Sequence, residues 1–245
     1  MLKTEKTEVL GWEHVIRGMR NPKNSWDRTD SCTKGPLYCS DYCCNHVGCE
    51  QETGLVIGPN DYNLMKTLRN AGTDHRKFMR MIVVYADITA PLYWWKEYDT
   101  YKVGTVTNSC STMHKIHAKE FTLDDFSHEH LGNILDFSDL NMKAPVIDAS
   151  PFNDEVTTYT GPKNILELTI SMLNECRKLY LETQDKRYWW QMIQLLPTSY
   201  NQKRTVMLNY EVLTNIYISR RNRYKKSFNF IYNYIHRQTP FFNQY

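Results

Sequence analysis

Residues 196–209 have the sequence LPTSYNQKRTVMLN and lead without a break into YEVLTNIYISR, residues 210–220. Pro197 has no backbone amide to donate, so we expect a preceding helix to end there. Alternating apolar residues predict a short strand over Arg204–Leu208. Asn209 then suits the N-cap of a following helix, because its side chain can accept a hydrogen bond from an otherwise unsatisfied amide.

The predicted helix carries two further polar residues, Asn215 and Arg220, six and eleven positions after Asn209. Amide groups and a guanidinium along one element could bind a planar, anionic ligand. The alternative for the same pattern is a capped surface helix with a solvated polar face. The stretch therefore predicts a strand followed by a helix, with a candidate anion site on the helix.

Composition indicates a globular protein. Of 245 residues, 41% are hydrophobic and 23% are charged, so we expect one large domain over residues 1–245. No apolar run approaches the length of a bilayer span, and no signal-peptide pattern opens the chain, so we expect a cytoplasmic protein without a membrane segment. Tyr and Trp, at 17 and 6 residues, favour aromatic-lined surfaces that could stack on a ring or a partner.

Charge is unevenly distributed, although the net charge is only +3. Residues 203–245 hold eight Lys or Arg and one acid, whereas residues 120–155 hold nine acids and one Lys. A basic C-terminal face could bind phosphates or nucleic acid, or it could pair with the acidic segment or remain solvated. Because aromatic–glycine modules of the RNA-binding kind are absent, we expect a phosphorylated small molecule rather than nucleic acid.

Periodicity predicts helices mixed with a few strands. The expected strands are Glu5–Leu10 and Phe78–Tyr85, and the expected helices are Glu13–Met19 and an amphipathic Asn164–Thr183. Two more helices are expected, one capped by Asn60 or Asp61 and stopped by Gly72, the other begun by Thr89 and Pro91 and carrying Leu92, Trp95, Tyr98 and Lys102. The pattern predicts an α/β (α+β mixed) fold with a central sheet flanked by helices. A polar, acidic segment at about 119–160 is expected to be an excursion or lid.

Five cysteines lie close together in a segment at about 30–50, beside His46: Cys32, Cys39, Cys43, Cys44 and Cys49. Four thiolates that converge tetrahedrally can bind zinc or iron, but the spacing C-x6-C-x3-C-C-x4-C fits no zinc-ribbon or ferredoxin pattern well. A structural metal and a loop of reduced thiols are therefore both open. A second, weaker ligand set is Cys110, His114 and His117, of which a helix would place the first two on one face.

The chain resembles the flavin-dependent thymidylate synthases, most strongly over residues 51–115 and 188–242. In that family a proline and an asparagine are spaced like Pro197 and Asn209, and a second asparagine and an arginine follow with the spacing of Asn215 and Arg220. A family histidine matches His75, and an Ala-Pro that opens a helix matches Ala90-Pro91. The resemblance implies the family fold in a single domain.

The family's signature motif, Arg-His-Arg followed by a serine and an arginine, is eroded in this chain. Counted without gaps, it falls on Thr100, Tyr101 and Lys102, then on Cys110 and Thr112, while a one-residue insertion would place Ser111 at the serine. A family glutamine corresponds to Glu97 and a family glutamate to Asn108. The arginine expected just before the Leu-Pro pair is missing. Ile193 stands in its ungapped place, with Gln191 or Gln194 nearby. Neither Thr nor Gln can form the bidentate hydrogen bonds that arginine makes to a phosphate.

The resemblance implies FAD-dependent reductive methylation of dUMP to dTMP, or a related C5 alkylation of a uracil nucleotide. Methylenetetrahydrofolate and NADPH would be co-substrates, in a homotetramer with active sites where subunits meet. The implied cofactor-binding residues are His75, Thr100, Tyr101, Lys102, Asn209 and Asn215. The implied substrate-binding residues are Glu97, Asn108, Cys110, Ser111 and Arg220, with His75, Cys110 and Arg220 as the catalytic candidates.

Cys110 is open to two interpretations. A thiolate beside Lys102 or Arg220 could add to C6 of a uracil ring, or the cysteine could be a small replacement for serine. Two other functions also remain open: a flavin- or nucleotide-binding homologue that has lost the chemistry, and a metal-stapled protein associated with nucleic acid.

Overall fold

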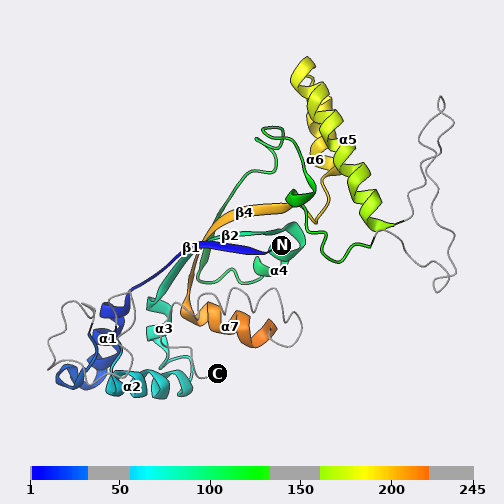
Figure 1. Ribbon diagram of the computed structural model, residues 1–245. Helices are drawn as coiled ribbons and strands as arrows, with labels where there is room; N and C mark the ends of the chain where they lie inside the picture. Colours follow the sequence, from blue (N-terminus) through cyan, green and yellow to red (C-terminus); the bar gives the residue numbers. More distant parts are fainter. Residues whose placement is uncertain (1, 33–55, 133–160, 221–245) are drawn as a thin grey trace, which may run out of the picture. The chain divides into compact units, whose positions relative to one another are not determined.

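The computed structural model describes residues 2–32, 56–132 and 161–220, and it has the mixed α/β fold that the sequence predicts (Figure 1). Four strands form one antiparallel sheet in the order β1-β2-β4-β3. They are β1 (Lys3–Leu10), β2 (Val83–Pro91), β3 (Thr105–Ser109) and β4 (Asn201–Asn209).

Seven α-helices lie within the described residues: α1 (Trp12–Arg20), α2 (Pro59–Asn70), α3 (Lys77–Met81), α4 (Leu92–Tyr98), α5 (Pro162–Thr183), α6 (Lys186–Leu195) and α7 (Tyr210–Arg220). Short 3-10 turns are η1 (Asn21–Lys23), η2 (Trp26–Arg28) and η4 (Leu123–Asp125). None of these helices combines the length and the apolar character that a membrane span requires.

The chain forms two compact units. The first unit holds Thr89–Glu97 and the described residues of Ser109–Lys203. The second holds Tyr98–Asn108 and the described residues of Leu2–Ile88 and of Arg204–Tyr245. Each unit is described separately below.

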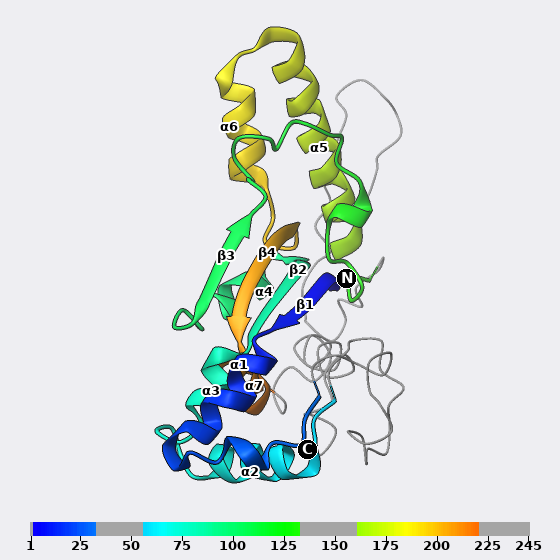
Figure 2. The ribbon, with the colours of Figure 1, turned by 90° about the vertical axis from the view of Figure 1, so that its left-hand side faces the viewer.

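In the first unit, α5 and α6 lie side by side as a helical hairpin (Figure 2). The hairpin turns at Gln184, which has a left-handed backbone conformation (φ 57°) and ends α5. Asp185 then caps α6 by accepting a hydrogen bond from the Arg187 amide at 2.9 Å. The predicted helix Asn164–Thr183 is confirmed, although Ile165, expected on its apolar face, is exposed.

One buried hydrophobic cluster of the first unit is formed by Ile116, Phe121, Phe126, Leu166, Leu173, Cys176 and Met192. Residues 119–132, the described part of the predicted acidic excursion, contribute Phe121 and Phe126 to this core. Asn174 of α5 fixes that segment by accepting from the Phe121 amide at 2.8 Å and donating to its carbonyl at 2.9 Å. Residues 133–160 lie outside the described residues.

In the second unit, α3 packs against both α1 and α7 (Figure 1). Trp12 of α1 meets Tyr210 of α7 edge to face, with ring centroids 5.4 Å apart. The predicted strand Glu5–Leu10 and helix Glu13–Met19 are confirmed within β1 and α1.

Three predicted element boundaries differ from the structure. Phe78–Met81 is helical rather than extended, with β2 starting only at Val83, and α4 ends at Tyr98, which places Lys102 in the loop beyond it. A short apolar run cannot distinguish a buried helix from a strand, and the paired burial of Phe78 and Met79 fits a helix. Pro91 ends β2 rather than opening α4. The first two amides of α4, those of Leu92 and Tyr93, donate to the carbonyls of Tyr200 and Thr198.

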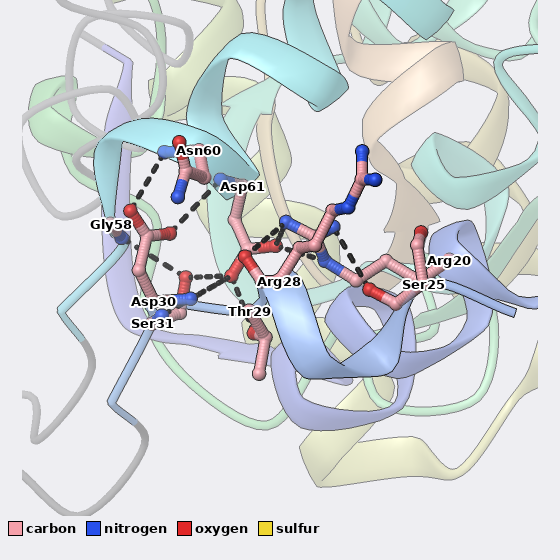
Figure 3. Close-up of polar contacts among 9 residues, drawn as sticks. All are labelled: Arg20, Ser25, Arg28, Thr29, Asp30, Ser31, Gly58, Asn60 and Asp61. Atoms are coloured by element: carbon pink, nitrogen blue, oxygen red, sulfur yellow. Dashed lines mark hydrogen bonds and ion pairs between the residues drawn. The ribbon is translucent and has the colours of Figure 1, made fainter.

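The predicted cap of α2 is also wrong: neither Asn60 nor Asp61 is the N-cap, because α2 begins at Pro59 after Gly58. Asp61 instead forms a buried ion pair with Arg20, 41 residues earlier in the chain (Figure 3). One Asp61 oxygen accepts from Arg20 at 2.7 Å, and the other accepts from the hydroxyls of Thr29 and Ser31 at 2.6 and 2.7 Å. We call these four residues the Asp61 cluster.

The Asp61 cluster is fully hydrogen-bonded. The Arg20 guanidinium also donates to the carbonyls of Ser25 and Arg28, at 3.2 and 2.9 Å. Burial by itself would raise the pKa of Asp61, but the hydrogen bonds from Thr29, Ser31 and Arg20 outweigh it and hold that pKa below its usual range. The cluster therefore fixes the 20–31 segment to the first turn of α2.

Asp30 completes this junction by accepting from the amides of Asn60 and Asp61, at 2.8 and 3.1 Å (Figure 3). Its carboxylate supplies the cap that α2 lacks in its own sequence, at the helix end where a negative charge is favoured. A methyl group on Gly58 would lie 2.2 Å from the Asp30 carboxyl carbon, so the junction requires glycine at this position.

Candidate functional site

The first turn of α7 is built as the sequence predicts. Asn209 ends β4, and its side-chain oxygen accepts a hydrogen bond from the Val212 amide at 3.0 Å, which confirms it as the N-cap. The Tyr210 amide donates to the Ile82 carbonyl at 3.1 Å and ties this turn to the start of β2. Because the cap uses the oxygen of Asn209, the side-chain NH2 is the part of this residue that can contact a ligand.

The 99–104 loop lies against the same turn. Gly104 has φ +80°, and a methyl group on it would lie 2.6 Å from the Asn209 side-chain nitrogen and 3.3 Å from a Val212 methyl. Only glycine combines this conformation with so close an approach. The loop that carries Thr100, Tyr101 and Lys102 is therefore adjacent to Asn209.

An ion pair holds the start of this loop on β4. Asp99 accepts from Arg204 at 2.9 and 3.2 Å. The neighbouring Tyr98 is buried, and burial raises the pKa of its phenol, which therefore stays neutral at ordinary pH. Lys102 itself is exposed to solvent, so its ammonium is accessible to an anionic ligand.

His75 lies in the turn between α2 and α3. Gly72 opens the turn with φ +104°, and its carbonyl accepts from the amides of His75 and Arg76, each at 3.1 Å. Arg76 reaches across to α7, where its side chain donates to Glu211 at 2.8 Å. The His75 turn is thereby tied to the first turn of α7, so the His75 turn and the 99–104 loop each contact that turn within the second unit.

The other predicted residues of the second unit lie on exposed surfaces or at the end of α7. Asn215 is exposed on α7, and Asn108 is exposed on β3. Arg220 is the last residue of α7, and its predicted contact with the uracil stays a prediction.

Three predicted substrate-binding residues belong to the first unit: Glu97, Cys110 and Ser111. Glu97 is half-buried on α4, and Cys110 is an exposed, reduced cysteine. The Cys110 backbone is fixed to β4, since its amide donates to the Lys203 carbonyl at 2.9 Å and its carbonyl accepts from Gln202 at 2.7 Å. The thiol thus projects from an anchored backbone.

Ser111 has a different role from its neighbour. Its hydroxyl accepts from the amides of Met113 and His114, at 3.1 and 2.9 Å, and contacts the His114 ring at 3.0 Å. The hydroxyl stabilises its own turn, whereas the thiol of Cys110 is exposed. The assignments of Cys110 and of Ser111 to the family serine both stay predictions.

The predicted metal sites receive no support from the described residues. Among those residues no group of three or more His, Cys, Asp or Glu side chains could hold a metal ion. Residues 112–117 form turns instead of the helix that would align Cys110 with His114, and His117 packs edge-on against Tyr180. Cys32 pairs through its backbone with Val56; Cys39, Cys43, Cys44 and Cys49 lie outside the described residues.

Sequence reasoning missed Gly104, Arg76 and Glu211. Gly104 had one local signal, a glycine two residues after Lys102, the third position of the signature. The contact between Arg76 and Glu211 joins residues 135 positions apart, and single-sequence patterns carry no signal for such a pair.

No sequence-family model and no curated protein sequence matches the chain. Solved structures do match it. Thymidylate synthase X (ThyX) of Helicobacter pylori with FAD and dUMP superposes with a TM-score of 0.59 at 13% identity, over 100% of this chain and 96% of that one. A second structure, the flavin-dependent thymidylate synthase ThyX of the same organism complexed with FAD and dUMP, gives 0.55 at 13% identity over 97% and 94%.

These similarities extend over nearly the whole of both chains, so the chain has the fold of the flavin-dependent thymidylate synthases. The fold that the resemblance implied is therefore confirmed.

Proposed function

We propose that the chain is an enzyme that reductively methylates C5 of a uracil nucleotide with FAD as its cofactor. The substrate is dUMP or a pyrimidine nucleotide whose phosphate is recognised differently. Methylenetetrahydrofolate supplies the carbon and NADPH the electrons. The enzyme would act as a cytoplasmic homotetramer with active sites at subunit interfaces.

One observation carries the proposal: in a chain with this fold, the three segments predicted to bind flavin meet at the first turn of α7. The Arg76–Glu211 ion pair connects the His75 turn to the first turn of α7, and the contact of Gly104 with Asn209 connects the 99–104 loop to it. These segments were assigned from separate parts of the sequence. Their convergence on one turn supports a common ligand.

The residues present suit FAD in their chemistry. The NH2 group of Asn209 is not used by the cap and lies beside Gly104, His75 and Asn215 are exposed, and Lys102 lies in the adjoining loop. Donors and a cation match a planar ring system with carbonyl groups and phosphates. Bound FAD would supply the hydride that reduces the transferred carbon.

The chain's own residues would bind, orient and stabilise charge. Asn209 and Asn215 would hold and orient the ring system by hydrogen bonds, and Lys102 would lie near phosphate. Arg220, at the end of α7, would face the uracil oxygen and stabilise the negative charge that develops there. Thr100 and Tyr101, in place of the family's arginine and histidine, leave fewer cations for phosphate.

The first test is the absorption spectrum of the purified protein, with FAD titration of any flavin-free fraction. Flavin bands or saturable FAD binding are expected. The second test is rescue of a thymidine-requiring bacterial strain, which separates a working enzyme from a binding protein. Failure to bind FAD under any condition would overturn the proposed function.

A specific observation favours one alternative. The eroded signature at Thr100, Tyr101 and Thr112 suits a homologue that binds flavin or nucleotide without performing the chemistry. Saturable FAD binding with no rescue and no conversion of dUMP would identify this alternative. For the metal-stapled, nucleic-acid-associated protein, elemental analysis and the effect of chelators on the melting temperature are the corresponding measurements.

A further inference from the structure

Glu211 lies at the junction between two segments of the candidate site. One carboxylate oxygen accepts from Arg76 at 2.8 Å, and the other accepts from Arg80 at 3.4 Å. The Glu211 side chain is 13% exposed, whereas those of Arg76 and Arg80 are 31% and 40% exposed. The carboxylate is thus partly withdrawn from water and faces two guanidinium groups of the 76–80 segment.

The neighbours of this pair are candidate site residues on both sides. Arg76 directly follows His75 and shares with it the Gly72 carbonyl as acceptor. Glu211 lies two residues after Asn209 and one turn before Asn215 on α7. A negative charge in the first turn of a helix is also favoured by the helix dipole. Loss of the carboxylate would release the His75 turn while leaving the Asn209 cap intact.

We propose that Glu211 is a positioning residue of the flavin site, which holds His75 in register with Asn209 and Asn215 through Arg76. This inference rests on the proposed function. The carboxylate need not touch the cofactor; it acts by fixing the distance between two segments that do. The effect on binding should therefore depend on the presence of His75.

The experiment is a double-mutant cycle on FAD affinity, measured by quenching of flavin fluorescence with the full chain. Glu211→Gln should weaken FAD binding by about tenfold, within the usual range for coupled groups in contact. In a His75→Ala background the same substitution should cost less than about twofold, because the residue it positions is gone. Arg76→Gln should match Glu211→Gln, and the pair combined should be no worse than either alone.

Ser31→Ala is the matched control. It removes two hydrogen bonds of the hydroxyl, one donated to Asp61 and one accepted from the Gly58 amide. It should lower the free energy of unfolding at least as much as Glu211→Gln does and leave FAD affinity unchanged. Equal losses from Glu211→Gln with and without His75 would overturn the positioning role and leave the proposed function standing. Absence of FAD binding by the unaltered chain would overturn both.

Discussion

Two carboxylates of the second unit each accept from arginine, but their environments differ. Asp61 accepts from one guanidinium and two hydroxyls, whereas Glu211 accepts from two guanidinium groups. Asp61 is 0% exposed and Arg20 is 4% exposed, and each has several hydrogen-bonding partners. Glu211 retains some exposure, and its two arginines are substantially exposed beside the His75 turn. Within the described residues, the buried Asp61–Arg20 pair has no hydrogen bond to the candidate ligand-binding residues, so we expect it to act on the structure of its own junction. A half-exposed pair beside a candidate ligand site can also determine how the site is arranged.

The largest expected effect is from breaking the enclosed pair. Asp61→Asn leaves the buried Arg20 guanidinium without its counter-charge, and removing one partner of a buried pair costs about 3–5 kcal/mol. Glu211→Gln should cost at most about 1 kcal/mol, as for exposed pairs. Urea unfolding followed by circular dichroism measures both free energies of unfolding.

Equal losses of unfolding free energy from Asp61→Asn and Glu211→Gln would contradict the difference between the two carboxylates. Arg20→Met provides a check on Asp61→Asn, because it removes the other charge of the same pair and should also destabilise strongly. Little loss from either variant would mean that the Asp61 cluster is not a determinant of stability.

Acidification should reduce the contribution of the Asp61 cluster to the free energy of unfolding. The folded-state pKa of Asp61 lies below its unfolded value of about 3.9, so the stabilisation is fully present above about pH 4. As the pH falls further, the unfolded chain binds the proton first and the contribution is lost. The difference in unfolding free energy between the unaltered chain and Asp61→Asn should therefore narrow from pH 5 to pH 3. A constant difference would contradict the lowered pKa.

Local signals account for what the sequence predicted correctly. Asn209 was identified as an N-cap because capping depends on residues within three positions, and Val212 lies at that spacing. The end of α6 before Pro197 and the amphipathic α5 follow from equally local chemistry. The fold followed from the resemblance, which rests on the spacing of a few residues.

Long-range pairing accounts for most of what the sequence did not predict. Asp61 has the residue type and position of a helix cap, and only its contact with Arg20 assigns it to the core instead. The helix over Phe78–Met81 occurs in a run of apolar residues that is equally compatible with a strand. In both cases a tertiary contact, and not the local pattern, determines the structure.

At the candidate site, substitution of Asn209 at the end of β4 or of Asn215 on α7 should lower the free energy of unfolding less than Asp61→Asn does, but should weaken FAD binding more. Asn209→Ala removes the cap, at about 0.5–2 kcal/mol, and also removes the NH2 group proposed to bind FAD. Asn215→Ala removes an exposed amide and should leave stability unchanged within about 0.5 kcal/mol. Both should lower flavin occupancy of the purified protein, measured by absorbance. Full occupancy in both variants would show that the proposed cofactor site is wrong.

The smallest expected effect on stability, and the sharpest test of chemistry, is at Cys110. The thiol is exposed on an anchored backbone, so Cys110→Ser and Cys110→Ala should each change the unfolding free energy by less than about 0.5 kcal/mol. If the thiolate adds to C6 of the uracil, both variants lose dUMP conversion, and the unaltered chain forms an adduct with a 5-fluorouracil nucleotide that mass spectrometry detects. If Cys110 only replaces serine, Cys110→Ser keeps full activity and no adduct forms. That second result would exclude covalent catalysis at Cys110 while leaving the proposed flavin-dependent reaction in place, because the residues at the first turn of α7 do not depend on this thiol.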